Sequence, residues 1–405
     1  MHSTRLRLIL GICCIVSVTP HASGRPQYTI QGLTYPESPE SVLGTLRVGG
    51  LDDRGRVGYS ADIALVIGAE NTQDRPNELY FYDGSQIHII PALGGDHARF
   101  SDVSDSGIAV AAANTSETYT TSSGYVTHPL KAIMYRQGNV TEVSIPDSLY
   151  TVPYAVNDFG DVAGTTQAGV FIARGVAGIE LIGYFGGQAA FPVDMNNHGD
   201  VLVNVLYREP YLEYGEYAYG GTETLIYRDG EEVWLPRTQH GIASGAAIND
   251  AGSVAGSFGV IPGRENHAFV WDSKNGLHDL GIAGEVSAAL DINDLAQVVG
   301  MFGPSYGSPT EAFIYDEVNG RRRLSDLMAP ADRWFNLEYA THINNRGQIL
   351  GIGQKTASYW SRQLFLMTPV PEPSSALLTV VMLACISLRA RRLTGRLVSN
   401  LCPSA

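Results

Sequence analysis

The chain consists largely of short apolar runs of strand length, separated by clusters of glycine, asparagine and aspartate. One local pattern recurs: an apolar residue precedes Asn or Asp, a small residue follows three positions later, and a second apolar residue follows after one spacer. Asn and Asp side chains fold back onto the local backbone, and glycine takes a positive φ at no steric cost, so the pattern predicts a tight hairpin between two strands. The Asn-equivalent residues of its seven copies are Asp52, Ser104, Asn157, Asn196, Asn249, Asn293 and Asn344.

The spacing of these copies predicts a repeat architecture. Successive copies lie 52, 53, 39, 53, 44 and 51 residues apart, a mean of roughly 49 that falls in the range of propeller blades. Each unit continues with a second hairpin, which is clearest from His267 to Gly281. Seven units of four short strands predict an all-β fold, a seven-bladed β-propeller of four-stranded blades.

The two ends of the repeat region predict how the ring closes. The seventh unit reaches its third strand at residues 364–368 and has no fourth, whereas Tyr28–Leu33 forms a strand pattern before the first unit. We expect this N-terminal strand to complete the last blade as its outer strand, which leaves no open sheet edge.

Composition and charge narrow the classes of function. Apolar residues make up 44% of the chain and charged residues 17%, which suits a turn-rich protein with a packed core. The cysteines are Cys13, Cys14, Cys385 and Cys402, so residues 24–370 hold neither a disulfide nor a thiolate metal site. The net charge of −14 disfavours nucleic acid as a partner, because binding there depends on Lys and Arg neutralising phosphates.

Residues 1–23 have the layout of a secretory signal peptide. Arg5 and Arg7 precede an apolar run from Leu8 to Val18, and small and polar residues follow as far as Ser23. The sequence therefore predicts export.

The C-terminal region carries a second sorting element. Val370-Pro371-Glu372-Pro373 precedes the apolar run Ala376–Leu388, which predicts a transmembrane helix that is short for a permanent span. A cluster of arginines follows, and together these features resemble the PEP-CTERM sorting signal of exported Gram-negative proteins. The residues that carry the resemblance are Pro371, Glu372, Pro373, Arg389, Arg391 and Arg392.

The resemblance implies processing by an exosortase-type membrane enzyme, transient insertion in the inner membrane, and a final location at the cell surface or in an exopolysaccharide matrix. Residues 393–405 form a basic and polar tail beyond the point where such signals normally stop, and an unprocessed hydrophobic anchor is the alternative. The predicted organisation is a signal peptide at 1–23, an ectodomain at 24–369, a sorting signal at 370–392 and the tail at 393–405.

The fifth and sixth units resemble the extracellular HAF repeat of exported bacterial proteins. His267-Ala268-Phe269 with Trp271, Gly276-Leu277-His278-Asp279-Leu280-Gly281 and Ile292-Asn293-Asp294 carry the resemblance, which is strong over about residues 240–302 and degenerate elsewhere. It supports fold and export more than a particular ligand. The recurrence of His267 and His278 within the repeat favours a structural role for both.

The connections from the second to the third strand vary in length and should gather on one face of the ring, where binding sites usually lie. The segment from residue 207 to 219 is the most suggestive, because tyrosines alternate there with carboxylates and could contact sugar rings. The alternative is that they pack on the rim. The tyrosines are Tyr207, Tyr211, Tyr214, Tyr217 and Tyr219.

A second candidate site is the position two residues before each turn Asn. Three carboxylates and an imidazole, Asp102, Asp194, Asp291 and His342, occupy it in different units. If they faced the axis they could ring a cation such as Ca²⁺. Alanines at the equivalent positions 155 and 247 favour burial between blades instead, with each Asp bonded to a neighbouring backbone.

No linear motif of a metalloprotease, serine hydrolase, phosphate loop or paired-cysteine zinc site is present, and the sequence implies no cofactor. We therefore expect a non-enzymatic exported propeller that binds extracellular polysaccharide or another envelope component. A polysaccharide-active hydrolase or lyase is the alternative, because such carboxylate pairs leave no linear motif. A purely structural envelope protein is a third possibility.

Overall fold

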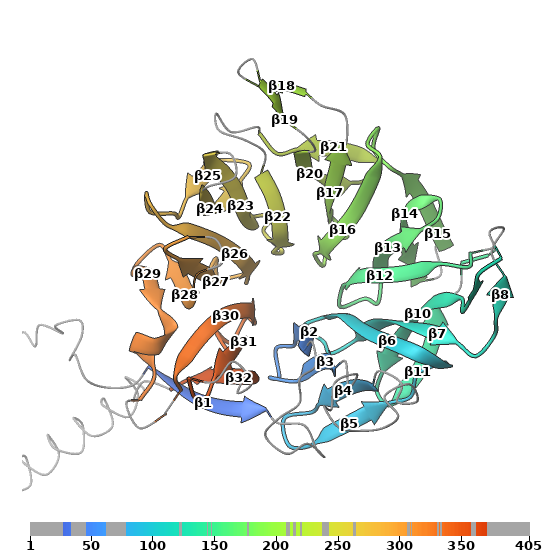
Figure 1. Cartoon of the computed structure of the whole chain (residues 1–405), viewed down its shortest axis with the longest axis horizontal. Helices are drawn as coiled ribbons and strands as arrows, with labels where there is room; N and C mark the ends of the chain where they lie inside the picture. Colours follow the sequence, from blue (N-terminus) through green and yellow to red (C-terminus); the bar gives the residue numbers. More distant parts are fainter. Residues whose placement is uncertain are drawn as a thin grey trace, which may run out of the picture.

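A computed structural model shows seven antiparallel sheets of four strands arranged around a central axis (Figure 1). This confirms the predicted all-β, seven-bladed propeller. The structure describes residues 27–33, 46–61 and 78–370. Short gaps in the last range lie at 121–123, 144, 147, 176–177, 208–210, 214–215, 219–220, 237–242, 262–264, 306–307, 309, 330–331, 333 and 358–361.

The blades follow one another along the chain, and each begins with its innermost strand. Blade 1 comprises β2 (Leu46–Leu51), β3 (Val57–Ala61), β4 (Glu78–Tyr82) and β5 (Ile87–Ile90). Blade 2 comprises β6 (Gly94–Val103), β7 (Ala109–Thr115), β10 (Leu130–Arg136) and β11 (Asn139–Val143). Blade 3 comprises β12 (Thr151–Val156), β13 (Val162–Thr166), β14 (Gly169–Arg174) and β15 (Gly178–Gly183).

The remaining blades repeat the arrangement. Blade 4 comprises β16 (Ala189–Met195), β17 (Val201–Tyr207), β20 (Gly221–Arg228) and β21 (Glu231–Trp234). Blade 5 comprises β22 (Ala243–Ile248), β23 (Val254–Ile261), β24 (Glu265–Asp272) and β25 (Gly276–Asp279). Blade 6 comprises β26 (Val286–Ile292), β27 (Val298–Gly303), β28 (Glu311–Asp316) and β29 (Gly320–Arg323). Blade 7 comprises β30 (Asn336–Ile343), β31 (Ile349–Gln354), β32 (Arg362–Pro369) and β1 (Tyr28–Leu33).

The N-terminal strand closes the ring, as the sequence predicted. β1 pairs with β32 in an antiparallel register that runs from Tyr28 opposite Pro369 to Leu33 opposite Leu364 (Figure 1). A short 3₁₀ helix, η2 (Leu324–Leu327), also holds the entering chain, since the Gln27 amide donates to the Leu327 carbonyl at 2.9 Å. All seven blades and the closing pair lie within residues 27–370, so this region contains the whole closed ring.

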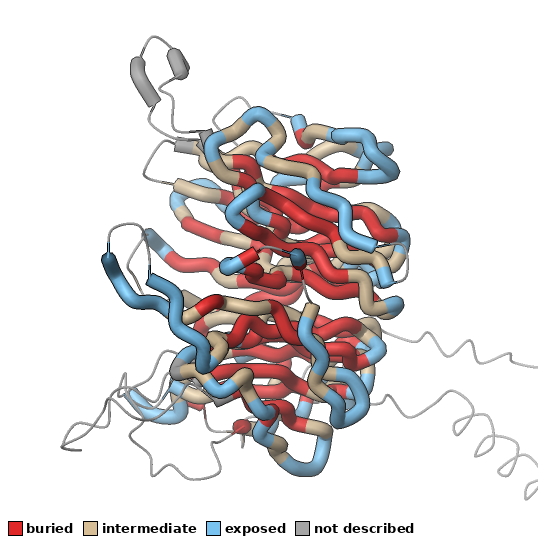
Figure 2. Tube along the Cα trace, turned by 90° about the vertical axis from the view of Figure 1, so that its right-hand side faces the viewer, coloured by how far each residue is buried: buried red, intermediate tan, exposed pale blue. Residues whose placement is uncertain are grey.

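The core lies between neighbouring blades. Each sheet buries residues against the next sheet, and the buried residues occupy the interior of the stacked blades (Figure 2). One cross-strand pair recurs: Gly256 on β23 faces Phe269 on β24, whose ring is fully buried. A Cβ atom at Gly256 would lie 2.8 Å from the Phe269 ring, so glycine leaves the space that the ring fills. The same pairing joins Gly164 to Phe171, Gly300 to Phe313 and Gly351 to Phe365.

The predicted targeting segments at the two ends of the chain fall outside the described residues. These are the signal peptide at 1–23, the sorting signal beyond Val370 and the tail at 393–405. Within the described residues, no helix is long and apolar enough to cross a membrane.

Candidate functional site

The innermost strands of the blades surround a central channel. A cavity of about 180 Å³ occupies it and is lined mainly by the turn signature and the residues just before it. The strand order places the signature turns at one end of the channel, which we call the turn end. Connections from second to third strands lie at the other end, which we call the loop end.

At the turn end, the Asn side chains of the signature link blade to blade. The side-chain oxygen of Asn249 accepts the Ser253 amide of its own turn at 2.9 Å, while its Nδ2 donates to the Asn293 carbonyl of the next blade at 3.0 Å. The same link recurs from blade 3 onward, and the last one, from Asn344 to the Asp52 carbonyl at 2.7 Å, joins blade 7 to blade 1. Its other copies are Asn157 to Asn196, Asn196 to Asn249 and Asn293 to Asn344. The signature Asn is therefore an element of ring closure as well as of turn formation.

Blade 1 departs from this scheme, because Asp52 has no amide to donate. The buried Asp52 carboxylate instead accepts a hydrogen bond from Arg56 Nε at 2.5 Å. Arg56 Nη2 donates to the Ser106 carbonyl of blade 2 at 2.8 Å. A guanidinium thus provides the inter-blade link that an amide provides elsewhere.

A second ring lies at the next turn position. There the backbone amide of one blade donates to the side-chain oxygen of the next, as from Asn197 to Asp250 and from Asp250 to Asp294, both at 2.8 Å. This ring contains five carboxylates and two amides, so the turn end is acidic. Burial and the neighbouring carboxylates raise the pKa of Asp105 to about 8. The ring consists of Asp53, Asp105, Asp158, Asn197, Asp250, Asp294 and Asn345.

Just inside the channel, the predicted carboxylates also hold blades together. Asp194 Oδ1 accepts the amide of Met195 at 2.7 Å, and its Oδ2 accepts the amide of Ile248 in the next blade at 2.8 Å. Asp102 bonds the Val103 and Val156 amides in the same way, and Asp291 bonds those of Ile292 and Ile343. The expectation that each Asp hydrogen-bonds a neighbouring backbone is confirmed.

These carboxylates do not form a cation cage. In the described part of the chain, no group of three or more His, Cys, Asp or Glu side chains could hold a metal ion. Burial raises the pKa of Asp102 to about 8, of Asp291 to about 7 and of Asp194 to about 6. Burial lowers the pKa of His342 to about 4, so this imidazole is neutral at pH 7.

A β-bulge recurs beside these positions and was not anticipated from the sequence. In each blade the register of the innermost strand shifts at the residue three before the signature Asn equivalent. In five blades the bulged residue lines the channel; these are Ser101, Tyr154, Val193, Ala246 and Leu290. Bulges re-aim side chains, and in this fold they determine the composition of the channel wall.

Near the bulges a second cavity of about 250 Å³ lies beside the innermost strands of blades 1 to 3. We call it the arginine cup; it is lined by Arg47, Val48, Arg99, Phe100, Ser101 and Tyr154. Ser101 and Tyr154 line the channel as well, so the cup adjoins it. Arg47 and Arg99 precede the turn by five residues on strands that run toward the turn end, which places the cup toward the loop end.

The two arginines occupy equivalent places in neighbouring blades. Both are exposed, and neither has a hydrogen-bond or ion-pair partner among the described residues. Phe191 occupies the same place in blade 4, and its ring lies 6.3 Å from the Tyr154 ring. The other blades carry Val152, Ser244, Ala288 and Tyr339 there. Aligning the seven copies position by position would have shown that blades 1 and 2 alone are basic at this place.

The predicted tyrosine segment forms a separate hairpin outside the sheet of blade 4. β18 (Tyr211–Glu213) pairs with β19 (Glu216–Ala218), with Leu212 opposite Tyr217 (Figure 1). Tyr207 ends β17, whereas Tyr214 and Tyr219 lie outside the described residues. Sugar binding by these tyrosines stays a prediction. Blade 2 carries a similar hairpin, β8 (Tyr119–Thr120) with β9 (Val126–Thr127), next to the exposed Tyr125.

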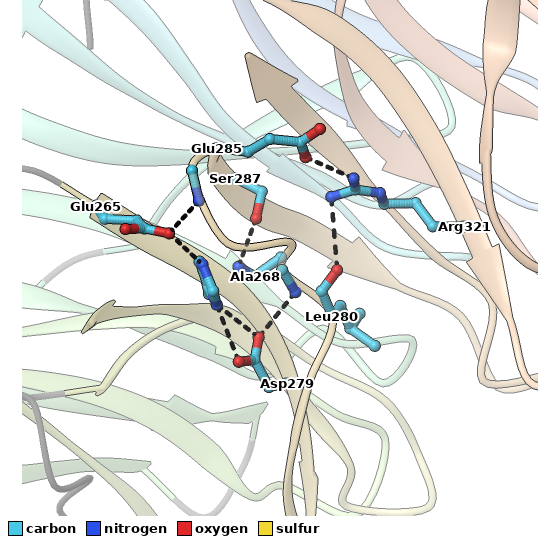
Figure 3. A network of polar contacts seen from close by, with 10 residues as sticks. Glu265, Ala268, Asp279, Leu280, Glu285, Ser287 and Arg321 are labelled. Carbon is cyan, nitrogen blue, oxygen red and sulfur yellow. Dashed lines mark hydrogen bonds and ion pairs between the residues drawn. The ribbon is translucent and has the colours of Figure 1, made fainter. Parts of the chain in front are cut away.

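A polar network that includes Glu265, Asp279 and Ser287 links blades 5 and 6 (Figure 3). The hydrogen bonds of His267 place it in this network. Its Nδ1 is 2.9 Å from Asp279 Oδ2, and its Nε2 is 3.1 Å from Glu265 Oε1. Burial lowers the pKa of His267, but the hydrogen bonds to the two carboxylates outweigh it and raise the pKa overall. A Cβ atom at Gly281 would lie 2.1 Å from the imidazole, so the glycine of this motif makes room for the ring. This packing supports a structural role for His267.

Comparison with known proteins supports the fold. No family model matches the sequence, and no curated protein matches it significantly. The chain is similar to the β-propeller domain of the Trilobed protease from Pyrococcus furiosus, with a TM-score of 0.53 and 11% identity over 82% of this chain and 97% of that domain. That domain has an open velcro topology, whereas here β1 completes the last blade.

Two further structures are less similar. Dipeptidyl peptidase 4 from Porphyromonas gingivalis has a TM-score of 0.41 and 11% identity, and the match covers 82% of this chain and 50% of that one. A gluconolactonase from Xanthomonas campestris has a TM-score of 0.33 and 11% identity, over 65% of this chain and 90% of that one. At 11% identity, the likeness to the propeller domain of the Trilobed protease shows a propeller fold and not an activity.

Proposed function

We propose that the chain is an exported, surface-associated, non-enzymatic propeller that binds extracellular polysaccharide or another envelope component. The observation that carries this proposal is the contrast between the two ends of the channel. Among the described residues, the polar side chains at the turn end bond neighbouring blades, whereas the guanidinium groups of the arginine cup bond nothing. A rigid ring with open polar groups at one end suits recognition.

The predicted targeting signals account for the export and surface location in this proposal. The signal peptide would export the chain, and the sorting signal that resembles PEP-CTERM would hold it in the inner membrane until an exosortase-type enzyme transfers it to the surface or matrix. Within residues 24–370 no cysteine is present, so the ectodomain would not depend on disulfide formation after export.

The hydrolase or lyase alternative is less well supported. Glycoside hydrolysis uses one carboxyl group as an acid and a second as a base or nucleophile. Asp102, Asp194 and Asp291 line the channel just inside the turn end, and each accepts two backbone amides. A carboxylate used in this way holds the scaffold, and moving it would break the contact between two blades.

The test is to incubate purified residues 24–370 with the exopolysaccharide of the host, and to follow both co-sedimentation and polymer length by size-exclusion chromatography. We expect retention of intact polymer. Shortened polymer would contradict the non-enzymatic assignment. Absence of any interaction would favour a protein partner or a purely structural role.

A further inference from the structure

We infer that the arginine cup binds the carboxylate of a uronic acid residue in an acidic polysaccharide. This inference rests on the proposed function and names its ligand class and its site. Basic residues are fewer than acidic residues in this chain. The protein carries 27 Lys and Arg against 41 Asp and Glu, and in the described part six arginines form ion pairs with acidic groups.

Arg47 and Arg99 differ from those arginines. They line one cavity from equivalent positions of adjacent blades and have no partner in the described part of the chain. A guanidinium presents a planar fork of donors that matches a carboxylate in two parallel hydrogen bonds. Two such groups at one cavity form a receptor for an anion, and no described residue uses their donors.

The rest of the wall favours a sugar as the carrier of that anion. Tyr154 lines the cup with an aromatic ring and a hydroxyl group, and Phe191 packs against it at 6.3 Å. An aromatic face with a polar tip suits partly hydrated contacts, such as those with sugar rings.

The volume of the cup and the charges around the channel restrict the class of ligand further. A volume of about 250 Å³ is below the range of roughly 300–1,000 Å³ that is typical of sites for drug-sized molecules, so the cup fits about one ring of a polymer. The ring of carboxylates at the turn end repels anions, which leaves the loop end as their approach. Two arginines in a chain of net charge −14 are too few for a nucleic-acid backbone.

The test compares two oligosaccharides of equal length, one of hexuronic acid and one of neutral hexose, by calorimetric titration onto residues 24–370. We expect the uronate oligomer to bind more tightly and its affinity to fall with salt, because screening weakens ion pairs at exposed sites. Arg47→Ala and Arg99→Ala should each weaken uronate binding roughly 10- to 100-fold, as for hydrogen bonds to charged groups. Equal binding of the neutral oligomer would overturn the inference.

Matched control variants distinguish binding at the cup from a general effect of positive charge. Arg54→Ala and Arg136→Ala each remove one exposed arginine away from the cup and should leave uronate binding within twofold. If they weaken binding as much as the cup variants, general charge and not the cup is responsible. Inorganic phosphate that competes equally with the uronate would identify a general anion site and would also overturn the inference.

The same experiment distinguishes the two proposals. If uronate still binds to the Arg47→Ala/Arg99→Ala variant, the ligand binds elsewhere. This result would contradict the assignment of the site to the cup and would leave the proposed binding function supported. If neither oligomer nor the host polymer binds, the proposed binding of polysaccharide fails too. Because both arginines are exposed and have no partner in the part of the chain that the structure describes, we expect these variants to fold normally, with melting temperatures like that of the parent.

Discussion

Asp194 in blade 4 accepts the backbone amide of Ile248 in blade 5 at 2.8 Å, so a side chain of the channel wall holds two neighbouring blades together. The same contact occurs from blade 2 to 3 and from blade 6 to 7. Aspartate therefore alternates with other residues around the ring. The odd-numbered blades carry Gly50, Ala155, Ala247 and His342 at the equivalent place.

Charge adds to the effect of burial at these positions. Burial raises the pKa of Asp102, and the negative charges of Asp194 and Asp291 raise it further. Carboxylates in adjacent blades would lie closer together and repel each other more strongly. The aspartate contact spans three of the seven junctions, and because the number of blades is odd, blades 7 and 1 are neighbours that both lack an aspartate at this place. There the Asn344 side chain bonds the Asp52 carbonyl and the Asn345 amide bonds Asp53 Oδ1.

Replacing Asp194 with alanine should destabilise the ring. The change leaves the amides of Met195 and Ile248 without their acceptor, at a cost of about 1–3 kcal/mol in the free energy of unfolding. Chemical denaturation would measure it, with the exposed Asp326→Ala as the control. Equal stability of the two variants would show that the contact contributes nothing.

Stability should fall as the pH rises from about 6.5 to 8. Burial raises the pKa of Asp102 to about 8 and that of Asp291 to about 7, so the folded chain binds more protons than the unfolded chain in this window. Stability then decreases with pH. His342, with a pKa lowered to about 4, acts in the opposite sense only below about 6.5.

The measurement is the melting temperature at pH 6.5 and at pH 8, for the parent and for Asp102→Asn. The variant should show a smaller decrease, because it lacks one of the titrating groups, and Asp326→Asn should behave like the parent. A melting temperature that rises from pH 6.5 to 8 would contradict the assignment.

The link between blades 1 and 2 can be exchanged for the one used elsewhere. Arg56→Ala leaves the buried Asp52 carboxylate without its cationic partner, which should cost about 2–4 kcal/mol after allowance for the partial exposure of Arg56. Asp52→Asn in the same chain supplies an amide like that of Asn249, so the double variant should recover part of the loss. A double-mutant cycle by denaturation measures the coupling, and strictly additive losses would show that the two groups act separately.

The glycine that faces each core phenylalanine should not tolerate a methyl group. In Gly256→Ala the new Cβ would lie 2.2 Å from the Ser244 carbonyl and 2.8 Å from the Phe269 ring. We expect a loss of about 1–3 kcal/mol, as for overpacked cores. Gly32→Ala on β1 is the control, because its Cβ would meet nothing closer than 3.4 Å. If both substitutions have the same effect on denaturation, the close packing has no energetic consequence.

Much of this architecture follows from local sequence. Asn249 and Gly252 form their turn through bonds within five residues, and Gly252 takes the positive φ of 76° that the pattern requires. Such short-range chemistry can be recognised wherever it recurs, and its spacing gave the number of blades. The missing fourth strand of the last unit identified Tyr28–Leu33 as its partner.

The role of the channel carboxylates and the arginine cup depended on tertiary structure. The sequence left two roles open for Asp194, because a carboxylate serves a cation or an amide equally well, and the position of the Ile248 amide decided between them. Arg47 and Arg99 lie 52 residues apart and become neighbours only when blades 1 and 2 pack. The sequence by itself determined the strands, the turns and the closure of the ring, because these depend on local backbone chemistry. Packing of the blades decided which side chains face each other across the channel, because bulges and inter-blade contacts join residues that are far apart in the chain.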